Sequence, residues 1–141
     1  VDYVPLLVVF ASSEEPEEGD ATNIADGDET TIWHTMYSIT LAKYPHWIDF
    51  DASEPKTMKG FKLTPRQDSG YGRIKDYEIY VSNDGKTWGE PIAKGEFDRT
   101  AELKKVMFDK PVKARFIRFR ALSAHYGVDY AAAAEFALIA E

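Results

Sequence analysis

The segment Ile-Lys-Asp-Tyr-Glu-Ile-Tyr-Val-Ser-Asn-Asp-Gly-Lys, Ile74–Lys86, gives the clearest indication of the fold. Apolar and polar residues alternate through Tyr77–Ser82, the period-two pattern of a strand with one buried face. The tetrapeptide Asn83-Asp84-Gly85-Lys86 follows, and its glycine tolerates a positive φ. This segment therefore predicts a strand over Ile74–Ser82 that ends in a hairpin turn.

Six other segments have the apolar or alternating character of strands: Tyr3–Ser12, Pro45–Asp51, Met58–Pro65, Leu103–Phe108, Arg115–Ala121 and Ala134–Ala140. We expect the first of these to be a buried strand, because it is an almost continuous run of apolar residues. Turn residues separate the segments, and no convincing helical period is present. This pattern predicts an all-β antiparallel sandwich that forms one domain over residues 1–141.

Composition excludes several classes of partner. The chain has 141 residues and a net charge of -7, which disfavours nucleic acid and anionic membranes as partners. It contains no cysteine, so it has neither disulfides nor thiol chemistry. No apolar run approaches the roughly 20 residues of a membrane span. Because the chain starts at Val1, we expect a domain excised from a larger protein or a mature product.

Two acidic segments lie near the N-terminus. Ser13–Asp20 is predicted to be an exposed acidic loop. Asp26-Gly27-Asp28 follows, within Asn23–Thr31, and places carboxylate and carbonyl oxygens around a flexible glycine. Such a set of oxygens suits a hard cation such as Ca²⁺, and a turn with solvated acids is the alternative.

Catalytic patterns do not emerge from the sequence. The acids fall in exposed loops, in turns or in the possible metal loop, and none has the apolar setting that raises the pKa of a general acid. We found neither a strained nucleophile turn nor a phosphate-binding glycine loop. The histidines are scattered without the spacing of a zinc site. We therefore expect a domain without catalytic activity.

An ordered set of short motifs along the chain resembles one known family. The motifs are Ala11-Ser12-Ser13-Glu14-Glu15, Asn23-Ile24-Ala25-Asp26-Gly27-Asp28, Thr31-Ile32-Trp33-His34-Thr35, Pro45-His46-Trp47-Ile48-Asp49, Pro65-Arg66-Gln67-Asp68, Gly72-Arg73-Ile74-Lys75-Asp76-Tyr77-Glu78-Ile79-Tyr80-Val81-Ser82, Asp84-Gly85-Lys86-Thr87-Trp88, Ala114-Arg115-Phe116-Ile117-Arg118 and Ala134-Glu135-Phe136. Together they are similar to the coagulation factor V/VIII type C (discoidin-like) domain, and most similar to bacterial family 32 carbohydrate-binding modules. The resemblance implies a jelly-roll sandwich with a structural calcium and a sugar site in the loops at one end.

The same resemblance implies ligands for the calcium. Backbone carbonyls would come from Asn23 and Ala134, and carboxylates from Asp26, Asp28 and Glu135. Thr31 would add its hydroxyl and carbonyl oxygens. The metal would join the early loop to the last strand and would play no catalytic part.

The resemblance also implies a sugar site. Galactose-binding members pair a histidine and an arginine with an asparagine and add an aromatic residue from a late loop. His34 and Arg66 match the first two, whereas Tyr71 stands near the place of the missing asparagine. Tyr126 and Tyr130 are the candidates for the aromatic platform. The three tryptophans are expected in core or strand packing instead.

Each polar candidate also has a structural explanation. Arg66 pairs with Asp68 or Asp76 if it belongs to the scaffold, and His34 then donates to a backbone carbonyl. Tyr37 and Tyr44 lie in an irregular loop and are further candidates for a wall of the site.

Taken with the resemblance, these features predict a monomeric carbohydrate-binding module that targets an attached, secreted glycoside hydrolase or surface protein to glycans. The expected location is secreted, periplasmic or cell-surface in a bacterium. Two alternatives stay open. One is a discoidin-like adhesion domain that binds protein or membrane, and the other is a structural spacer whose sugar site has decayed.

Overall fold

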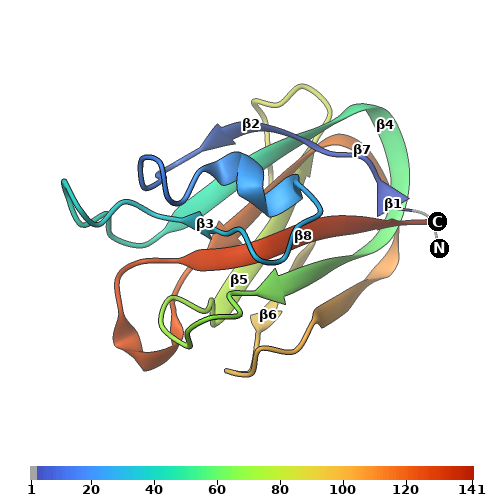
Figure 1. The fold of residues 1–141 in the computed structure, drawn as a ribbon. Helices are drawn as coiled ribbons and strands as arrows, with labels where there is room; N and C mark the ends of the chain where they lie inside the picture. Colours follow the sequence, from blue (N-terminus) through green and yellow to red (C-terminus); the bar gives the residue numbers. More distant parts are fainter. Residues whose placement is uncertain (1–2) are drawn as a thin grey trace.

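The computed structural model describes residues 3–141, in which strands predominate (Figure 1). The strands are β1 Tyr3–Val4, β2 Leu7–Ala11, β3 Trp33–His34, β4 His46–Pro65, β5 Asp76–Ser82, β6 Ala93–Glu96, β7 Lys104–Ala121 and β8 Ala132–Ala140. Two short 3₁₀ helices complete the described elements, η1 Ala21–Ala25 and η2 His125–Gly127. Within residues 3–141, no helix has the length and apolar character that a membrane crossing requires. The all-β prediction is confirmed.

The sandwich is built around two long antiparallel strands that run from one layer into the other. The first part of β4 pairs with β2 and with the last part of β7, whereas its second part pairs with β8 and with the first part of β7. The ladder between β4 and β7 is interrupted after Asp51, and Ser53 there has a φ of 75°. β5 and β6 extend the first layer beside β7, and β1 extends the second beside β8. Because β4 and β7 cross between the layers, the hydrogen bonds form one continuous network (Figure 1).

Aromatic side chains fill the space between the layers. Phe50 of β4 stacks on Phe136 of β8 with ring centroids 4.8 Å apart, which joins the two layers directly. Phe61 is fully buried at the centre of the core, and its ring contacts those of Tyr77, Phe97, Phe108, Phe119 and Phe136. In β5, Tyr77 and Ile79 are buried, as the alternation in that strand predicts.

Strands do form within Tyr3–Ser12, but the prediction of one continuous, buried strand there is wrong. The chain breaks at Pro5 and Leu6, so β1 joins β8 whereas β2 joins β4. Pro5 has no amide hydrogen to donate to a ladder, which favours the break. β2 lies at an edge and pairs with β4 alone, and Leu7 and Phe10 are 61% and 51% exposed. Apolar content by itself therefore did not predict burial.

Other strand ends were also predicted incorrectly. Pro45–Asp51 and Met58–Pro65 belong to one strand, β4, and Leu103–Phe108 and Arg115–Ala121 belong to β7. Pro55 and Pro111 lie between the predicted segments, each at a register shift, where a missing amide donor is tolerated. The turn after β5 forms, with Asp84 accepting bonds from the amides of Lys86 and Thr87, each at 2.8 Å. It is not a tight hairpin, because β6 begins only at Ala93.

The three tryptophans contribute to packing. Trp33 is fully buried, and its indole nitrogen donates to the carbonyl of Ser13 at 2.9 Å. Trp47 and Trp88 flank the guanidinium of Arg118, which lies 5.4 and 4.5 Å from their ring centroids. Arg118 is held in turn by two bonds to Asp49. The expectation that these residues serve core or strand packing agrees with these contacts.

Candidate functional site

Three connecting segments meet at one end of the sandwich, which lies on the left in Figure 1. They are residues 35–45, 66–75 and 122–131. Backbone contacts join them, since Thr35 donates to the carbonyl of Ala131 at 3.0 Å and Ala132 donates to the carbonyl of Gly72 at 2.9 Å. Bridges pair Arg73 with Ala132 and Ile74 with Ala124. The strands thus position the loops that carry the predicted sugar-binding residues.

His34 forms the base of this end. It is 4% exposed, and Nδ1 donates to the carbonyl of Thr35 at 2.7 Å. A carbonyl only accepts, so Nδ1 carries the proton and Nε2 of the neutral ring is an acceptor. Nε2 has no hydrogen-bond partner among residues 3–141 and is not enclosed by them. The predicted backbone contact is therefore present, yet it leaves one ring nitrogen for a ligand.

Two tyrosines pack on the His34 ring. Tyr130 stacks on it, and Tyr37 meets it edge-on, each with ring centroids 4.9 Å apart. Gly72 lies against Tyr130 so closely that a Cβ there would be 3.1 Å from the ring. The φ of Gly72 is +90°, a conformation that side chains rarely adopt. Glycine at this position is therefore needed for the contact between the 66–75 segment and Tyr130.

Arg66 connects the scaffold to the loop surface. Its Nε donates to Asp68 Oδ1 at 2.7 Å, and its Nη1 donates to the carbonyl of Tyr71 at 3.1 Å. The pairing with Asp68 is thus present, whereas Asp76 instead accepts a bond from Ser123. The bond from Arg66 holds the pKa of Asp68 below its ordinary value. Nη2 has no partner within the described chain, so donors remain available.

Tyr71 and Tyr126 form an exposed aromatic pair beside Arg66. Their ring centroids are 5.3 Å apart, and the side chains are 54% and 59% exposed. Tyr126 has a φ of 65°, and Gly127 after it has a φ of 69°, so this part of η2 turns sharply. The structure therefore brings all five predicted residues to one end, with His34 and Tyr130 below and Tyr71 and Tyr126 at the surface.

Glu15 supports the site, a role that no sequence pattern indicated. Ser13–Asp20 was expected to be exposed, but Glu15 is 4% exposed. Its carboxylate accepts bonds from the amides of Tyr37 and Ser38, at 2.9 and 3.1 Å, and from the Ser38 hydroxyl. The bond from the Ser38 hydroxyl, followed by that from the Tyr37 amide, holds the pKa of Glu15 below its ordinary value. From sequence alone an acidic loop of this kind is expected to be exposed to solvent, because its hydrogen-bond partners lie in a distant segment.

The base of the late loop is also held in place. His46 is buried and donates from Nε2 to the carbonyl of Asp129 at 2.7 Å, and Tyr44 donates to the carbonyl of Tyr130 at 3.2 Å. Burial lowers the pKa of His46 and raises that of Tyr44, so both rings are neutral. These contacts give Tyr44 a supporting position and fix the backbone on which Tyr130 stands.

Part of the predicted calcium set converges at the loop after η1. Asp26 Oδ2 accepts a bond from the Thr31 hydroxyl at 2.5 Å, and the Glu135 carboxylate of β8 lies beside Asp26. Ala134 falls at a register shift, between the residues that pair with Thr64 and Pro65. Asp28 instead directs its carboxylate to Thr30, with bonds of 2.8 and 2.6 Å. Groups of three or more acids and histidines that could hold a metal are absent from residues 3–141.

The carboxylates of Asp26 and Glu135 lie close together at this loop. Oε1 of Glu135 is buried and has no hydrogen-bond partner in the described chain. Burial and the neighbouring Asp26 raise the pKa of Glu135 to about 8. Burial also opposes ionisation of Asp26, but bonds from Thr31 and the Asp28 amide outweigh it and lower the pKa of Asp26. Two close carboxylates with one orphaned oxygen fit a hard dication that supplies the missing positive charge.

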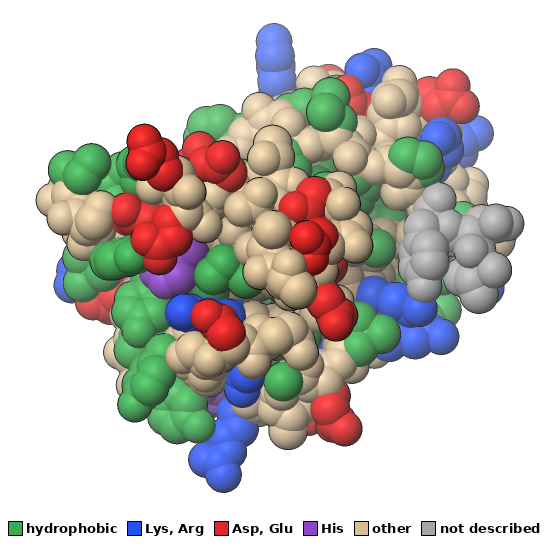
Figure 2. Space-filling model, in the orientation of Figure 1, with side chains coloured by type: hydrophobic (Ala, Val, Ile, Leu, Met, Phe, Trp, Pro, Cys, Tyr) green, Lys and Arg blue, Asp and Glu red, His purple; other side chains and the backbone are tan. Residues whose placement is uncertain are grey.

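The surface agrees with this arrangement of the loop end. Figure 2 shows hydrophobic side chains gathered at the end of the molecule where Figure 1 places the 122–131 loop, with a histidine beside them. Acidic side chains lie above them, over the N-terminal loops (Figure 2). An aromatic surface next to isolated donors and acceptors is suited to a sugar, whose rings have apolar faces and hydroxyl edges.

Comparisons with known proteins place the chain in a family. The F5/8 type C domain profile matches residues 9–136. A sialidase of Micromonospora viridifaciens is 40% identical over 139 residues, which cover 96% of this chain and 21% of the sialidase. The chain thus spans about a fifth of that relative's length.

Solved structures are similar over almost the whole chain. CpGH89CBM32-5 of Clostridium perfringens, in complex with GalNAc-β-1,3-galactose, has a TM-score of 0.90 and 32% identity, covering 99% of this chain and 100% of that one. The family 32 module of C. perfringens NanJ, in complex with galactose, has a TM-score of 0.85 and 27% identity, with 96% of each chain covered. From the matched profile and these similarities, we conclude that the chain belongs to the F5/8 type C domain family.

Proposed function

We propose that this chain is a non-catalytic carbohydrate-binding module that binds a galactose-type sugar at the loop end. The observation that carries the proposal is the convergence of His34, Arg66, Tyr71, Tyr126 and Tyr130 from three separate segments. Their arrangement combines exposed aromatic rings with one free acceptor and free donors. Tyr71 and Tyr126 contact one another and are each more than half exposed, so packing of the scaffold does not account for them.

Each group has a definite role in this proposal. A sugar ring places its apolar C–H face on Tyr71 or Tyr126. Nη2 of Arg66 donates to a ring hydroxyl, and Nε2 of His34 accepts from another. Tyr130 keeps the His34 ring in position. Because such a sugar buries little surface, the affinity of a single module is about millimolar to high micromolar.

The sugar complexes of the two similar Clostridium modules support the galactose-type preference. The missing asparagine separates this chain from the pattern that its resemblance implied, and Tyr71 occupies the neighbouring place. In our proposal, the Tyr71 ring replaces a hydrogen bond with stacking. The preference among galactose, its N-acetylamino form and related sugars then depends on this one substitution.

The biological role that we propose is to tether a larger enzyme to glycans. The sialidase relative is about five times the length of the matched segment, which supports a parent protein of the glycoside hydrolase type. Such a protein would be secreted or attached to a bacterial cell surface, and the module would act as a monomer within it. Weak single-site affinity would be raised by avidity between several modules.

We propose further that a calcium ion joins the loop after η1 to β8. Asp26, Glu135 and the Thr31 oxygens would hold it, with carbonyls of Asn23 and Ala134, and Asp28 would join after rotating away from Thr30. The orphaned Oε1 of Glu135 supports this assignment. The metal would supply positive charge between two carboxylates and thereby stabilise the fold.

A second candidate function, adhesion to a protein or lipid surface, is favoured by one observation. Tyr37, Ile39 and Leu41 are 42%, 75% and 42% exposed in the loop beside His34. These apolar side chains would insert into a membrane or an apolar protein groove. The net charge of -7 opposes anionic membranes.

The test is glycan binding by the wild-type domain and by Tyr126→Ala. We expect galactose binding by calorimetry in the wild type and none detectable in Tyr126→Ala, with an almost unchanged melting temperature. Leu103→Ala is the control, because Leu103 is 52% exposed outside the three loop segments. Unchanged affinity in Tyr126→Ala would remove this residue from the site. Silence on a glycan array together with liposome binding would favour the adhesion function.

A further inference from the structure

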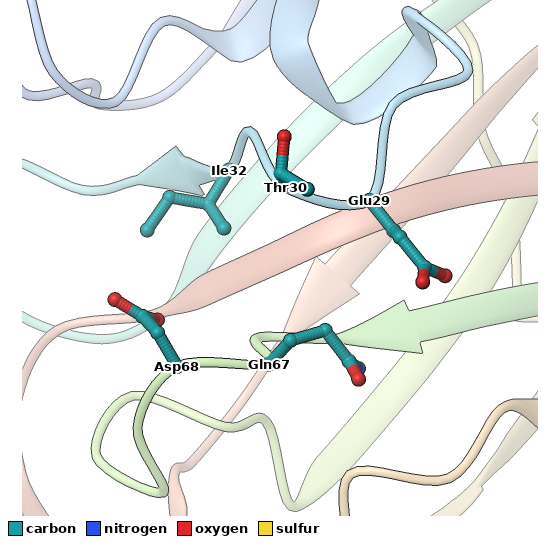
Figure 3. A pocket seen from close by; sticks show the side chains of 5 residues that line it. All are labelled: Glu29, Thr30, Ile32, Gln67 and Asp68. Carbon is teal, nitrogen blue, oxygen red and sulfur yellow. The ribbon is translucent and has the colours of Figure 1, made fainter.

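A hollow of about 350 Å³ lies next to the proposed sugar site and contains none of its five residues. It is lined by Glu29, Thr30, Ile32, Gln67 and Asp68. Figure 3 shows that the first three come from the segment before β3 and the other two from the segment after β4. Asp68 lies on the side of Ile32, and Gln67 lies on the side of Glu29 (Figure 3). One sugar ring fits a hollow of this size.

The lining offers acceptors and almost no donors. Nε2 of Gln67 donates to the carbonyls of Pro65 and Ala101, at 2.7 and 2.9 Å, so the amide leaves its oxygen free. The Thr30 hydroxyl donates to Asp28 at 2.6 Å, and it would be the one free donor of the lining if Asp28 turned to the proposed calcium ion. The bond from Arg66 uses Oδ1 of Asp68 and leaves Oδ2 free.

Glu29 gives the hollow its charge. Its carboxylate is exposed and has no hydrogen-bond partner among residues 3–141. The charge of Asp68 is balanced by Arg66 at 2.7 Å, so Glu29 is the unbalanced charge of the lining. A ligand therefore has to bring donors, as hydroxyl or ammonium groups do, and a carboxylate on the ligand would be repelled.

Arg66 connects the hollow to the sugar site. One edge of its guanidinium binds Asp68 in the lining, while Nη1 binds the carbonyl of Tyr71, whose ring contacts Tyr126. A glycan that lay on the aromatic pair and extended past Arg66 would therefore reach the hollow. Ile32 adds an apolar wall two residues before His34.

We propose that this hollow is a second subsite, which binds the neighbouring sugar unit of the glycan. It prefers a sugar that carries an amino group to a neutral sugar, and it disfavours a sugar that carries a carboxylate. The inference rests on the proposed sugar-binding function. It adds to that function a ligand at least two units long and a charge preference set by Glu29.

The test is the charge reversal Glu29→Lys. Calorimetry would compare galactose with three disaccharides, in which galactose is joined to glucose, glucosamine or glucuronic acid. We expect the variant to bind the glucosamine disaccharide about threefold more weakly and the glucuronic acid disaccharide about threefold more tightly, a typical effect of one exposed charge. Affinity for galactose alone should not change.

Glu54→Lys is the matched control, because it makes the same change of net charge at an exposed position in the turn of β4. The subsite is disproved if Glu29→Lys shifts the three disaccharides equally, or no more than Glu54→Lys does, while galactose still binds. If the wild type binds neither galactose nor any disaccharide, the proposed function itself fails and the subsite with it. The galactose measurement distinguishes these two failures.

Discussion

Replacement of Glu135 by glutamine separates two effects of the proposed calcium site. The wild-type carboxyl has a pKa of about 8 in the fold, compared with 4.5 as its ordinary value, because it is partly buried and lies beside the Asp26 carboxylate. Glutamine has the shape of the protonated acid and cannot ionise. The stability of the metal-free variant should therefore not fall with the ionisation that destabilises the metal-free wild type. The variant should also lack one of the proposed calcium ligands.

The direction with pH follows from the raised pKa. The unfolded chain releases the Glu135 proton near pH 4.5, whereas the metal-free fold retains it until about pH 8. The stabilising contribution is therefore fully present below 4.5 and is lost as the pH rises toward 8. The full difference in pKa corresponds to at most about 5 kcal/mol. Because Glu135 is partly exposed, we expect solvent screening to reduce this to about 2 kcal/mol.

The assay is thermal unfolding in chelator at about pH 5 and about pH 8, followed by the same measurement with calcium. At about 4 °C per kcal/mol in a chain of this size, the metal-free wild type should lose about 8 °C between the two pH values through Glu135. Calcium at about 100 times its Kd should add about 2.7 kcal/mol to the wild type at the higher pH. Glu135→Gln should show little of either effect, and Glu102→Gln, at an exposed position, should behave like the wild type.

Two outcomes would refute the reasoning. If Glu135→Gln loses as much stability as the wild type between the two pH values in chelator, the pKa of Glu135 is not the cause. If the variant keeps the full calcium response, Glu135 is not a ligand of the ion that stabilises the fold.

Two further changes test the support of the sugar site. Gly72→Ala should lower the free energy of unfolding by about 1–2 kcal/mol and weaken galactose binding, because a Cβ at φ +90° would press on the Tyr130 ring. Gly89→Ala is the control, because Gly89 has a φ of +63° but a Cβ there would meet no atom within 4 Å. Its free energy of unfolding should fall while its affinity for galactose is unchanged. An equal loss of affinity in both variants would contradict the role of the Tyr130 contact. Glu15→Gln should speed hydrogen exchange at the Tyr37 amide. In the wild type the pKa of Glu15 is lowered, so the stabilising contribution of its carboxylate is fully present above pH 4.5. The protection of the Tyr37 amide from exchange should therefore be lost as the pH falls through the lower pKa of the folded state. Protection that does not change with pH would exclude this role for Glu15.

Strand prediction succeeded where burial is a local property. Tyr77 and Ile79 alternate with polar residues because one face of β5 covers the core, and that pattern is visible in sequence. For Leu7–Ala11 the strand was predicted correctly but its burial was not, because these apolar residues lie on an uncovered edge. Strand prediction also split β4 and β7 into two segments each. From the local sequence, a proline at a register shift within a strand cannot be distinguished from a proline that ends a strand.

Among the site residues too, some were visible in the local sequence and others depended on distant contacts. Tyr71 and Tyr126 were candidates from residue type and loop position, and the motif order suggested His34 and Arg66. The buried role of Glu15 had no signal in the sequence, because its partners Tyr37 and Ser38 lie more than twenty residues away. The partnership of Asp26 with Glu135 came from the resemblance alone, since nothing local connects the two carboxylates.

The sequence by itself determined the all-β class, the family and the kinds of side chain available at the loop end. These follow from periodicity, turn residues and motif order, which are properties of short segments. Only the tertiary structure decided which side chains meet, which carboxylate is left without a partner, and that a hollow of acceptors adjoins Arg66. The reason is physical: burial and pairing depend on contacts between segments far apart in the chain, and those contacts exist only after β4 and β7 have brought the two layers together.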